Sequence, residues 1–123
     1  MKKSIVIPVA FFVLIVTVGS CSKDNEEDQP GNDNCVTENM SFAGNIQPIL
    51  NANCTTCHNP NLLNGNVNLT TYDGVKVVAD NGKLVGVINH SPGFPPMPQS
   101  GGKLSDCNID KIEAWISQGK QNN

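Results

Sequence analysis

The sequence predicts a small helical domain, and three observations carry that prediction. The chain has 123 residues, which is room for one domain and little else. Apolar residues recur at helical spacing in several short segments between residues 45 and 119. Two intervening stretches, residues 59–68 and 90–102, are rich in Asn, Gly or Pro and favour irregular loops. We therefore expect short helices joined by loops in residues 40–123.

The first 20 residues are typical of an export signal and not of the domain. Two lysines precede an apolar run over residues 5–18, which is short for a membrane span of roughly 20 residues. The tetrapeptide that ends at Cys21, Val-Gly-Ser-Cys, resembles a bacterial lipobox, in which the cysteine becomes the lipidated N-terminus. We expect residues 1–20 to be a lipoprotein signal peptide and Cys21 to carry the lipid. A permanent membrane anchor and an ordinary cleavage site are the alternatives.

Residues 21–39 are typical of an acidic, flexible tether. This segment holds six acidic residues against Lys23 alone and almost nothing apolar, whereas the charges of residues 39–123 cancel. Its start resembles the acidic surface-export signal of lipoproteins in the Bacteroidetes. We expect an exported protein anchored by lipid to a bacterial membrane, the outer membrane first and its cell-surface side as an alternative. The chain has no Arg and no basic patch, which argues against a nucleic-acid partner.

The first helix of the domain is expected over residues 45–53. Ile46, Ile49 and Leu50 share one helical face. Asn45 is a suitable N-cap. Pro48 then falls in the first turn, where its missing N–H does no harm.

The middle of the domain predicts two further short elements. Thr71 is placed to cap a helix over residues 72–79, and Asp80-Asn81-Gly82 is a turn signal. Residues 83–89 predict another helix, with a strand as the alternative because three of them are β-branched.

The last helix has the clearest signals. Ser105 is a good N-cap, and Asp106 places a negative charge in the first turn, where it is favoured. Gly119 is a natural stop. One apolar face is built from Ile109, Ile112, Trp115 and Ile116.

The strongest functional signal is Cys54-Thr55-Thr56-Cys57-His58, a Cys-x-x-Cys-His run of the kind that attaches a c-type haem. Two thiols at this spacing can reach the two vinyl groups on one edge of the porphyrin and form thioethers. The histidine that follows can then bind the iron through an imidazole nitrogen. We therefore predict one covalent haem c, with His58 as an iron ligand.

Other interpretations of these five residues stay open. A zinc site needs further ligands, for which only the isolated His90 and Cys107 are at hand. A thioredoxin-like redox pair needs a βαβ setting that the sequence does not suggest. A chance match is the last alternative.

A second axial ligand is expected from Met97. It lies between prolines in Phe-Pro-Pro-Met-Pro, a stiff loop that can present a thioether at small entropic cost. His90 is the rival and would give a bis-histidine site of lower potential, and an iron with one open position is the third alternative. The simplest alternative is a methionine that only fills a gap in the core.

The remaining cysteines predict a disulfide. Once Cys21, Cys54 and Cys57 are assigned, Cys35 and Cys107 remain, and export implies an oxidising compartment. A bridge between them would clasp the two ends of the domain and stabilise it by roughly 3–4 kcal/mol in the chain-entropy model. Two free thiols are the alternative.

Together these residues resemble the small class I-type cytochrome c domains common in Planctomycetes and Bacteroidetes. The resemblance covers nearly all of residues 42–119 and is carried by several motifs in order, at residues 45–50, 54–58, 69–74, 97–98, 101–105 and 112–116. It implies an all-α class I cytochrome c-like fold whose N- and C-terminal helices cross, with haem attached at Cys54 and Cys57. It also implies that His58 and Met97 are the axial ligands.

The resemblance also raises the question of the haem propionates. Trp115 would lie near one of them, or else only pack in the core. Because the chain has no Arg, lysines, Tyr72, Trp115 or backbone N–H groups would have to contact the propionates.

The function expected from the sequence is that of an electron carrier and not of an enzyme. One haem would cycle between Fe(II) and Fe(III) and exchange electrons with a redox partner protein. The first alternative is a haem enzyme or ligand-binding site for peroxide or gas at an open iron, with His90 as its only obvious acid or base. The second is a non-haem structural lipoprotein in which Cys54 and Cys57 bridge.

Overall fold

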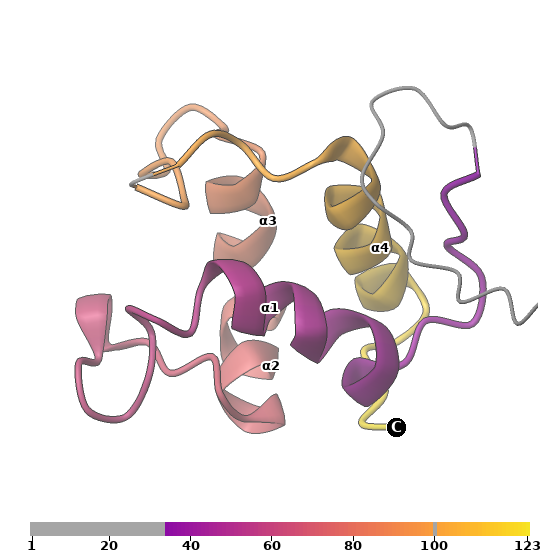
Figure 1. Cartoon of the computed structure of the whole chain (residues 1–123), viewed down its shortest axis with the longest axis horizontal. Coiled ribbons are helices and arrows are strands. Elements are labelled where there is room, and N and C mark those ends of the chain that lie inside the picture. The colour runs from indigo at the N-terminus through magenta and orange to yellow at the C-terminus, as the bar shows by residue number, and fades with distance from the viewer. Residues whose placement is uncertain (1–33, 100) are drawn as a thin grey trace, which may run out of the picture. The chain divides into compact units, whose positions relative to one another are not determined.

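A computed structural model describes residues 34–99 and 101–123. The predicted signal peptide, the predicted lipid site Cys21 and the predicted tether up to residue 33 lie outside the described residues. The described chain is helical and has no strand, which confirms the helical fold class for this part (Figure 1). None of its helices is long and apolar enough to cross a membrane. Its elements are the π-helix η1 (Phe42–Ile46), α1 (Gln47–Asn53), the 3₁₀ turn η2 (Asn64–Asn66), α2 (Tyr72–Asp80), α3 (Lys83–Ile88) and α4 (Asp106–Ser117).

The N-terminal helical segment begins earlier than the sequence predicts. Ser41 is the N-cap of η1, and its hydroxyl oxygen accepts a hydrogen bond from the Gly44 N–H at 3.0 Å. The prediction of Asn45 as N-cap is wrong, since Asn45 lies inside η1 and its side-chain oxygen accepts from the Ser41 N–H at 2.9 Å. The segment gains this extra turn because Phe42 is buried in the core, so the cap moves back to Ser41.

The junction of η1 and α1 accommodates Pro48. The N–H groups of Ile46 and Gln47 donate to the carbonyls five residues earlier, so the helix is wider here than an α-helix. In a regular α-helix, the proline ring would collide with the carbonyl four residues before it. A π-turn directly before Pro48 relieves this conflict. Pro48 lies in the first turn of α1, as predicted.

The predicted caps and turn define α2 and α3. The Thr71 hydroxyl oxygen accepts from the Gly74 N–H at 3.3 Å and caps α2, which ends one residue beyond its predicted end. Gly82 follows with φ +76°, a left-handed conformation that favours glycine. The segment after it forms the helix α3 and not the alternative strand. The helix buries Leu84 and Ile88, four residues apart on one face.

Both ends of α4 lie where the sequence predicts them. The Ser105 hydroxyl oxygen accepts from the Asn108 N–H at 3.3 Å at the N-terminus. After the last turn, Gly119 has φ +99°. Its N–H donates to the Ile116 carbonyl, and the Lys120 N–H donates to the Trp115 carbonyl at 2.9 Å. This pair of bonds is a Schellman motif, which satisfies the carbonyls at a helix C-terminus.

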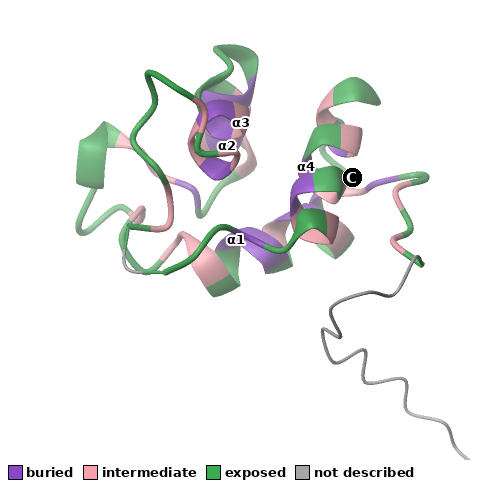
Figure 2. Cartoon of the chain, turned by 90° about the horizontal axis from the view of Figure 1, so that it is seen from above, coloured by how far each residue is buried: buried purple, intermediate pink, exposed green. Residues whose placement is uncertain are grey.

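One apolar core joins the helices, and Figure 2 shows that each of α1, α2, α3 and α4 contributes buried residues. At its centre, the Phe42 and Tyr72 rings meet edge to face with centroids 5.2 Å apart, and the Phe42 and Trp115 centroids are 5.7 Å apart. Such aromatic pairs contribute about 0.5–1.5 kcal/mol beyond area burial. α4 packs against η1, so the first and last helical segments meet around these rings. The side chains with almost no exposure are Ile46, Leu50, Val75, Ile88, Ile112 and Trp115.

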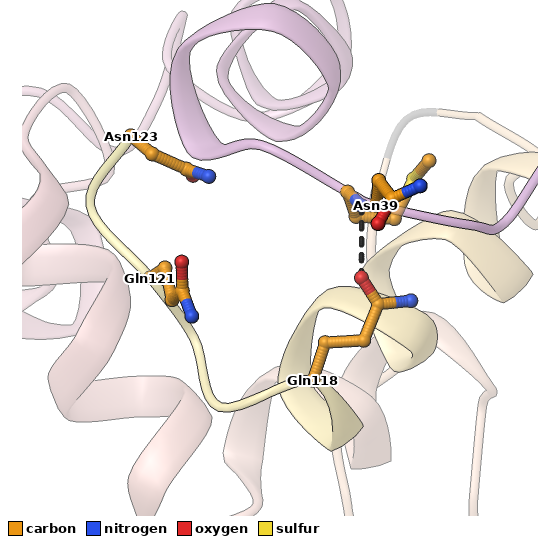
Figure 3. A pocket seen from close by; sticks show the side chains of 5 residues that line it. Asn39, Gln118, Gln121 and Asn123 are labelled. Atoms are coloured by element: carbon orange, nitrogen blue, oxygen red, sulfur yellow. Dashed lines mark hydrogen bonds between the residues drawn. The ribbon is translucent and has the colours of Figure 1, made fainter.

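The C-terminal segment, residues 118–123, returns to the start of η1. The Phe42 N–H donates to the Asn123 side-chain oxygen at 3.1 Å, and the Ala43 N–H donates to the Asn123 main-chain oxygen at 2.9 Å. Because the first N–H groups of a helix have no partner inside it, this segment acts as a second cap beside Ser41. Figure 3 shows Asn123 and Gln121 on this segment, at the edge of a pocket of about 290 Å³ lined mainly by amide side chains.

Residues 35–40 are attached to α4 at both of its ends. Cys35 forms a disulfide with Cys107, the pairing predicted from the sequence, with Cα atoms 5.5 Å apart. At the other end, the Gln118 side chain donates to the Thr37 carbonyl at 2.7 Å and accepts from the Met40 N–H at 2.8 Å (Figure 3). The last residues of the segment predicted as a tether therefore contact the domain.

Candidate functional site

The predicted haem-attachment motif forms a turn directly after α1. The Cys54 N–H continues the helical pattern and donates to the Leu50 carbonyl at 2.8 Å. The Cys54 carbonyl then accepts from the N–H groups of Cys57 and His58, at 3.2 and 3.0 Å. Two thiols and an imidazole are thereby placed on one short turn at the end of a helix.

The two thiols of this turn have different surroundings. Both are free in the structure and do not form a bond with each other. Cys57 is exposed, whereas Cys54 is half-buried and packs against the apolar core. Burial raises the pKa of the Cys54 thiol from 9.0 to about 11, because the charged thiolate is poorly solvated there.

These surroundings bear on the redox-pair interpretation of the motif. Redox-active pairs use a thiolate whose pKa is lowered by nearby positive charge or a helix N-terminus. Burial shifts the pKa of the Cys54 thiol in the opposite direction. In addition, Cys107, one of two candidates for a further zinc ligand, is bonded to Cys35.

The His58 ring is oriented by a main-chain carbonyl. Its Nδ1 lies 2.9 Å from the carbonyl oxygen of Asn64, which begins the turn η2. A carbonyl can only accept, so Nδ1 carries the hydrogen, and in the neutral imidazole Nε2 then has the lone pair. This arrangement is typical of metal-binding histidines, whose second nitrogen is held by a carbonyl or carboxylate.

The backbone around His58 is held in the same way. Its carbonyl accepts from the Leu69 N–H at 2.8 Å, so both ends of the loop over residues 59–68 are pinned near the motif. Within this loop Leu63 and Asn66 have positive φ, at 43° and 63°. These left-handed residues bend the chain tightly enough to bring the Asn64 carbonyl back to the imidazole.

Met97, the predicted second ligand, lies on the loop that follows α3. Its N–H donates to the Val87 carbonyl at 3.0 Å, and its side chain is half-buried. The peptide bond between Met97 and Pro98 is cis. The rival ligand His90 uses its Nε2 on the Met97 carbonyl oxygen, 3.1 Å away. The structure thus makes His90 a neighbour of the methionine's main chain.

The loop with Met97 and the turn with His58 lie at the same end of the described domain. In Figure 1 the loop is orange at the upper left and the segment after α1 is magenta to pink at the lower left, and both lie away from α4. The view from above in Figure 2 also has both on the side away from α4. A pocket of about 430 Å³ opens on the loop, lined by His90, Pro96, Pro98, Gln99 and Gly101.

Of the two alternatives for Trp115, the structure shows core packing. Trp115 is fully buried, and its indole N–H donates to the Gln121 carbonyl at 3.0 Å. The Tyr72 hydroxyl donates to the Lys120 carbonyl at 2.7 Å. Both polar groups are therefore used by the C-terminal segment.

Two contributors to this site were not predicted from the sequence. The carbonyl of Asn64 orients His58, and a main-chain carbonyl has no signature in the sequence. Gly86 lies under the Phe94 ring, where an added Cβ would approach ring atoms to 2.6 Å. A glycine inside a predicted helix was the available signal, since such a residue usually marks close packing.

Comparisons with known proteins leave the family open. No family model matches the sequence, and no curated protein and no solved structure matches it. The function must therefore be argued from the residues of the chain.

Proposed function

We propose that the chain is a mono-haem c-type cytochrome lipoprotein that carries single electrons by cycling iron between Fe(II) and Fe(III). The observation that carries this proposal is the His58 imidazole, whose Nδ1 is held by the Asn64 carbonyl on the turn that also bears two free thiols. An imidazole fixed in this tautomer offers Nε2 to a metal.

The residues present fit a c-type haem. Cys54 and Cys57 would hold the porphyrin through thioethers, and a neutral, half-buried Cys54 suits an uncharged thioether link at the edge of the core. His58 and Met97 would be the axial ligands. When bound, the haem would supply a one-electron couple, and methionine ligation would raise its potential.

The composition of the two segments that carry the motif and Met97 favours carrier function over catalysis. Residues 54–72 and 84–102 contain no Asp, Glu, Lys or Arg. Peroxide or gas chemistry at an open iron would need an acid or base on the distal side. The one candidate there, His90, has its Nε2 on the Met97 carbonyl. An electron carrier needs none of these groups.

The setting of the protein follows from its N-terminus. We propose that Cys21 carries lipid and holds the protein at a bacterial membrane, the outer membrane or its cell-surface side, where it meets a redox partner protein. Metabolic labelling with a fatty acid tests this anchor. Label on the wild type that disappears in Cys21→Ala is the expected result, and an unlabelled wild type would contradict it.

Haem attachment can be tested directly. The protein is expressed in a host with a cytochrome c maturation system and characterised by acid-acetone extraction and a pyridine haemochrome spectrum. The wild type should retain one haem per chain with a thioether-type α band. The double variant Cys54→Ser, Cys57→Ser should lose its haem on extraction, while Thr56→Ser, a change inside the same turn, should retain it. A colourless wild type, or haem that extracts freely, would overturn the proposal.

A further inference from the structure

The main chain of Met97 is held by α3 and the residues just after it. Its N–H donates to the Val87 carbonyl, and its carbonyl oxygen lies 3.1 Å from His90 Nε2. Because the carbonyl is an acceptor only, His90 must be the donor through Nε2–H. Both polar groups of the Met97 backbone are therefore fixed, although the residue lies in an irregular loop.

The end of α3 fixes the backbone of His90. His90 has φ +54°, the left-handed conformation that is common at the residue after a helix C-cap. Its N–H donates to the Val87 carbonyl at 3.4 Å and the Ser91 N–H donates to the Gly86 carbonyl at 3.0 Å, which is the same Schellman motif that ends α4. The His90 side chain is exposed, and its hydrogen bond to the Met97 carbonyl is the one hydrogen bond of the imidazole within the described residues. The backbone of His90 is therefore held by α3, and its imidazole holds the Met97 carbonyl.

The hydrogen bonds in the rest of the loop show which part of it His90 holds. The first half is docked on α3, because the Ser91 N–H donates to the Gly86 carbonyl at 3.0 Å and the Phe94 ring covers Gly86. Two prolines then follow, and neither has an N–H to donate. Beyond them, the two backbone hydrogen bonds of Met97 fix the chain again, and His90 makes one of them.

We propose that His90 is a positioning residue that holds the Met97 carbonyl and so keeps the thioether of Met97 at the iron. This inference rests on the proposed function. It replaces the idea of His90 as an alternative axial ligand with a role that acts through Met97. Loss of the hydrogen bond should raise the fraction of molecules in which the methionine has left the iron.

In the ferric haem protein, binding of exogenous imidazole measures the fraction of molecules in which Met97 has left the iron. Imidazole competes for the position that Met97 would occupy, so its apparent dissociation constant falls as the open fraction rises. His90→Asn keeps a residue type that tolerates the left-handed conformation but is too short to reach the Met97 carbonyl. His90→Gln places an amide N–H near the position of Nε2. The loss of one hydrogen bond should lower the apparent dissociation constant roughly fivefold to tenfold in His90→Asn, and His90→Gln should return it toward the wild-type value.

The outcomes separate this inference from the proposed function. Covalent haem, an Fe–S charge-transfer band that Met97→Ala abolishes, and tighter imidazole binding in His90→Asn support both. The same haem and band with unchanged imidazole binding overturn the role of His90 alone. A band-free bis-histidine spectrum that His90→Asn removes shows that His90 is a ligand and also overturns it. Thermal unfolding of His90→Asn serves as the control, since a purely structural role would lower stability without a selective change in imidazole affinity.

Discussion

The two ends of the domain are stabilised by different interactions. At the α4 end, formed by η1, α4 and residues 118–123, the Trp115 and Tyr72 polar groups and the first N–H groups of η1 all have partners. At the motif end, formed by residues 54–68 and 89–99, no residue is fully buried, and Cys54 is half-buried. Leu62, Leu63 and Phe94 are exposed there. The comparison teaches that the α4 end is stable through its own packing, whereas the motif end is organised mainly by hydrogen bonds to His58 and Met97.

The largest expected effect comes from breaking the α4 end at its centre. Trp115→Ala should lower the free energy of unfolding by about 3–5 kcal/mol, because it opens a cavity between Phe42 and Tyr72 and removes the bond to Gln121. Urea unfolding measures the change. Val77→Ala on the exposed side of α2 is the control and should stay within about 0.5 kcal/mol. Equal effects of the two variants would contradict a packed α4 end.

Removing the disulfide tests the same end through the unfolded state. The double variant Cys35→Ser, Cys107→Ser should lose about 3–4 kcal/mol, because the bridge closes a long loop between cysteines 72 positions apart. The shift in the urea midpoint gives the value. Thiol titration of the unfolded, unreduced wild type accompanies this measurement. Two reactive thiols in addition to those of Cys54 and Cys57 would show that the bridge does not form.

The motif end should contribute a pH dependence through the Cys54 thiol. In the haem-free chain, the pKa of Cys54 is raised from 9.0 to about 11 by burial. Below pH 9 the thiol is protonated in both states, but between pH 9 and 11 only the unfolded chain releases the proton. The free energy of unfolding should therefore fall by about 2–3 kcal/mol across this window. Urea unfolding at several pH values measures the slope, and Cys54→Ala should remove that part of it. An identical slope in the variant would show that Cys54 is not buried.

A smaller effect is expected where the Met97 loop rests on α3. Gly86→Ala places a methyl group against the Phe94 ring and should lower the free energy of unfolding by about 1–3 kcal/mol. Phe94→Ala in the same chain removes the obstacle and should restore most of the loss. Urea unfolding of both single variants and the double variant gives the coupling between the two sites. Additive effects would mean that the ring does not lie on Gly86.

Helices with local signals were predictable from the sequence. Thr71 and Ser105 are capping residues whose partners lie three residues away, and Gly119 sits where α4 stops. The start of the first helical segment was not predictable, because it depends on Phe42 being buried by α4 and on a π-turn that accommodates Pro48. The amide contacts of Asn123 likewise join residues 81 positions apart.

In the candidate site, too, the parts with a local signal were predictable from the sequence and the others were not. The motif at residues 54–58 was visible because its chemistry resides in side chains at fixed spacing. The Asn64 carbonyl that orients His58 is a main-chain group, and any residue would supply it. The bond from His90 to Met97 depends on His90 being the left-handed residue that ends α3, a position where glycine is usual and which the sequence therefore does not mark.

The disulfide also defines a path for mechanical force. A pull on the chain before Cys35 passes through the sulfur atoms to Cys107 in the first turn of α4. Residues 36–106 form the closed covalent loop between the two cysteines, and they include the motif, the turn η2 and the Met97 loop. Tension between the N-terminal side and α4 therefore passes through the disulfide and bypasses this loop. A chain pulled from its N-terminal side and from α4 would carry the force without drawing His58 and Met97 apart.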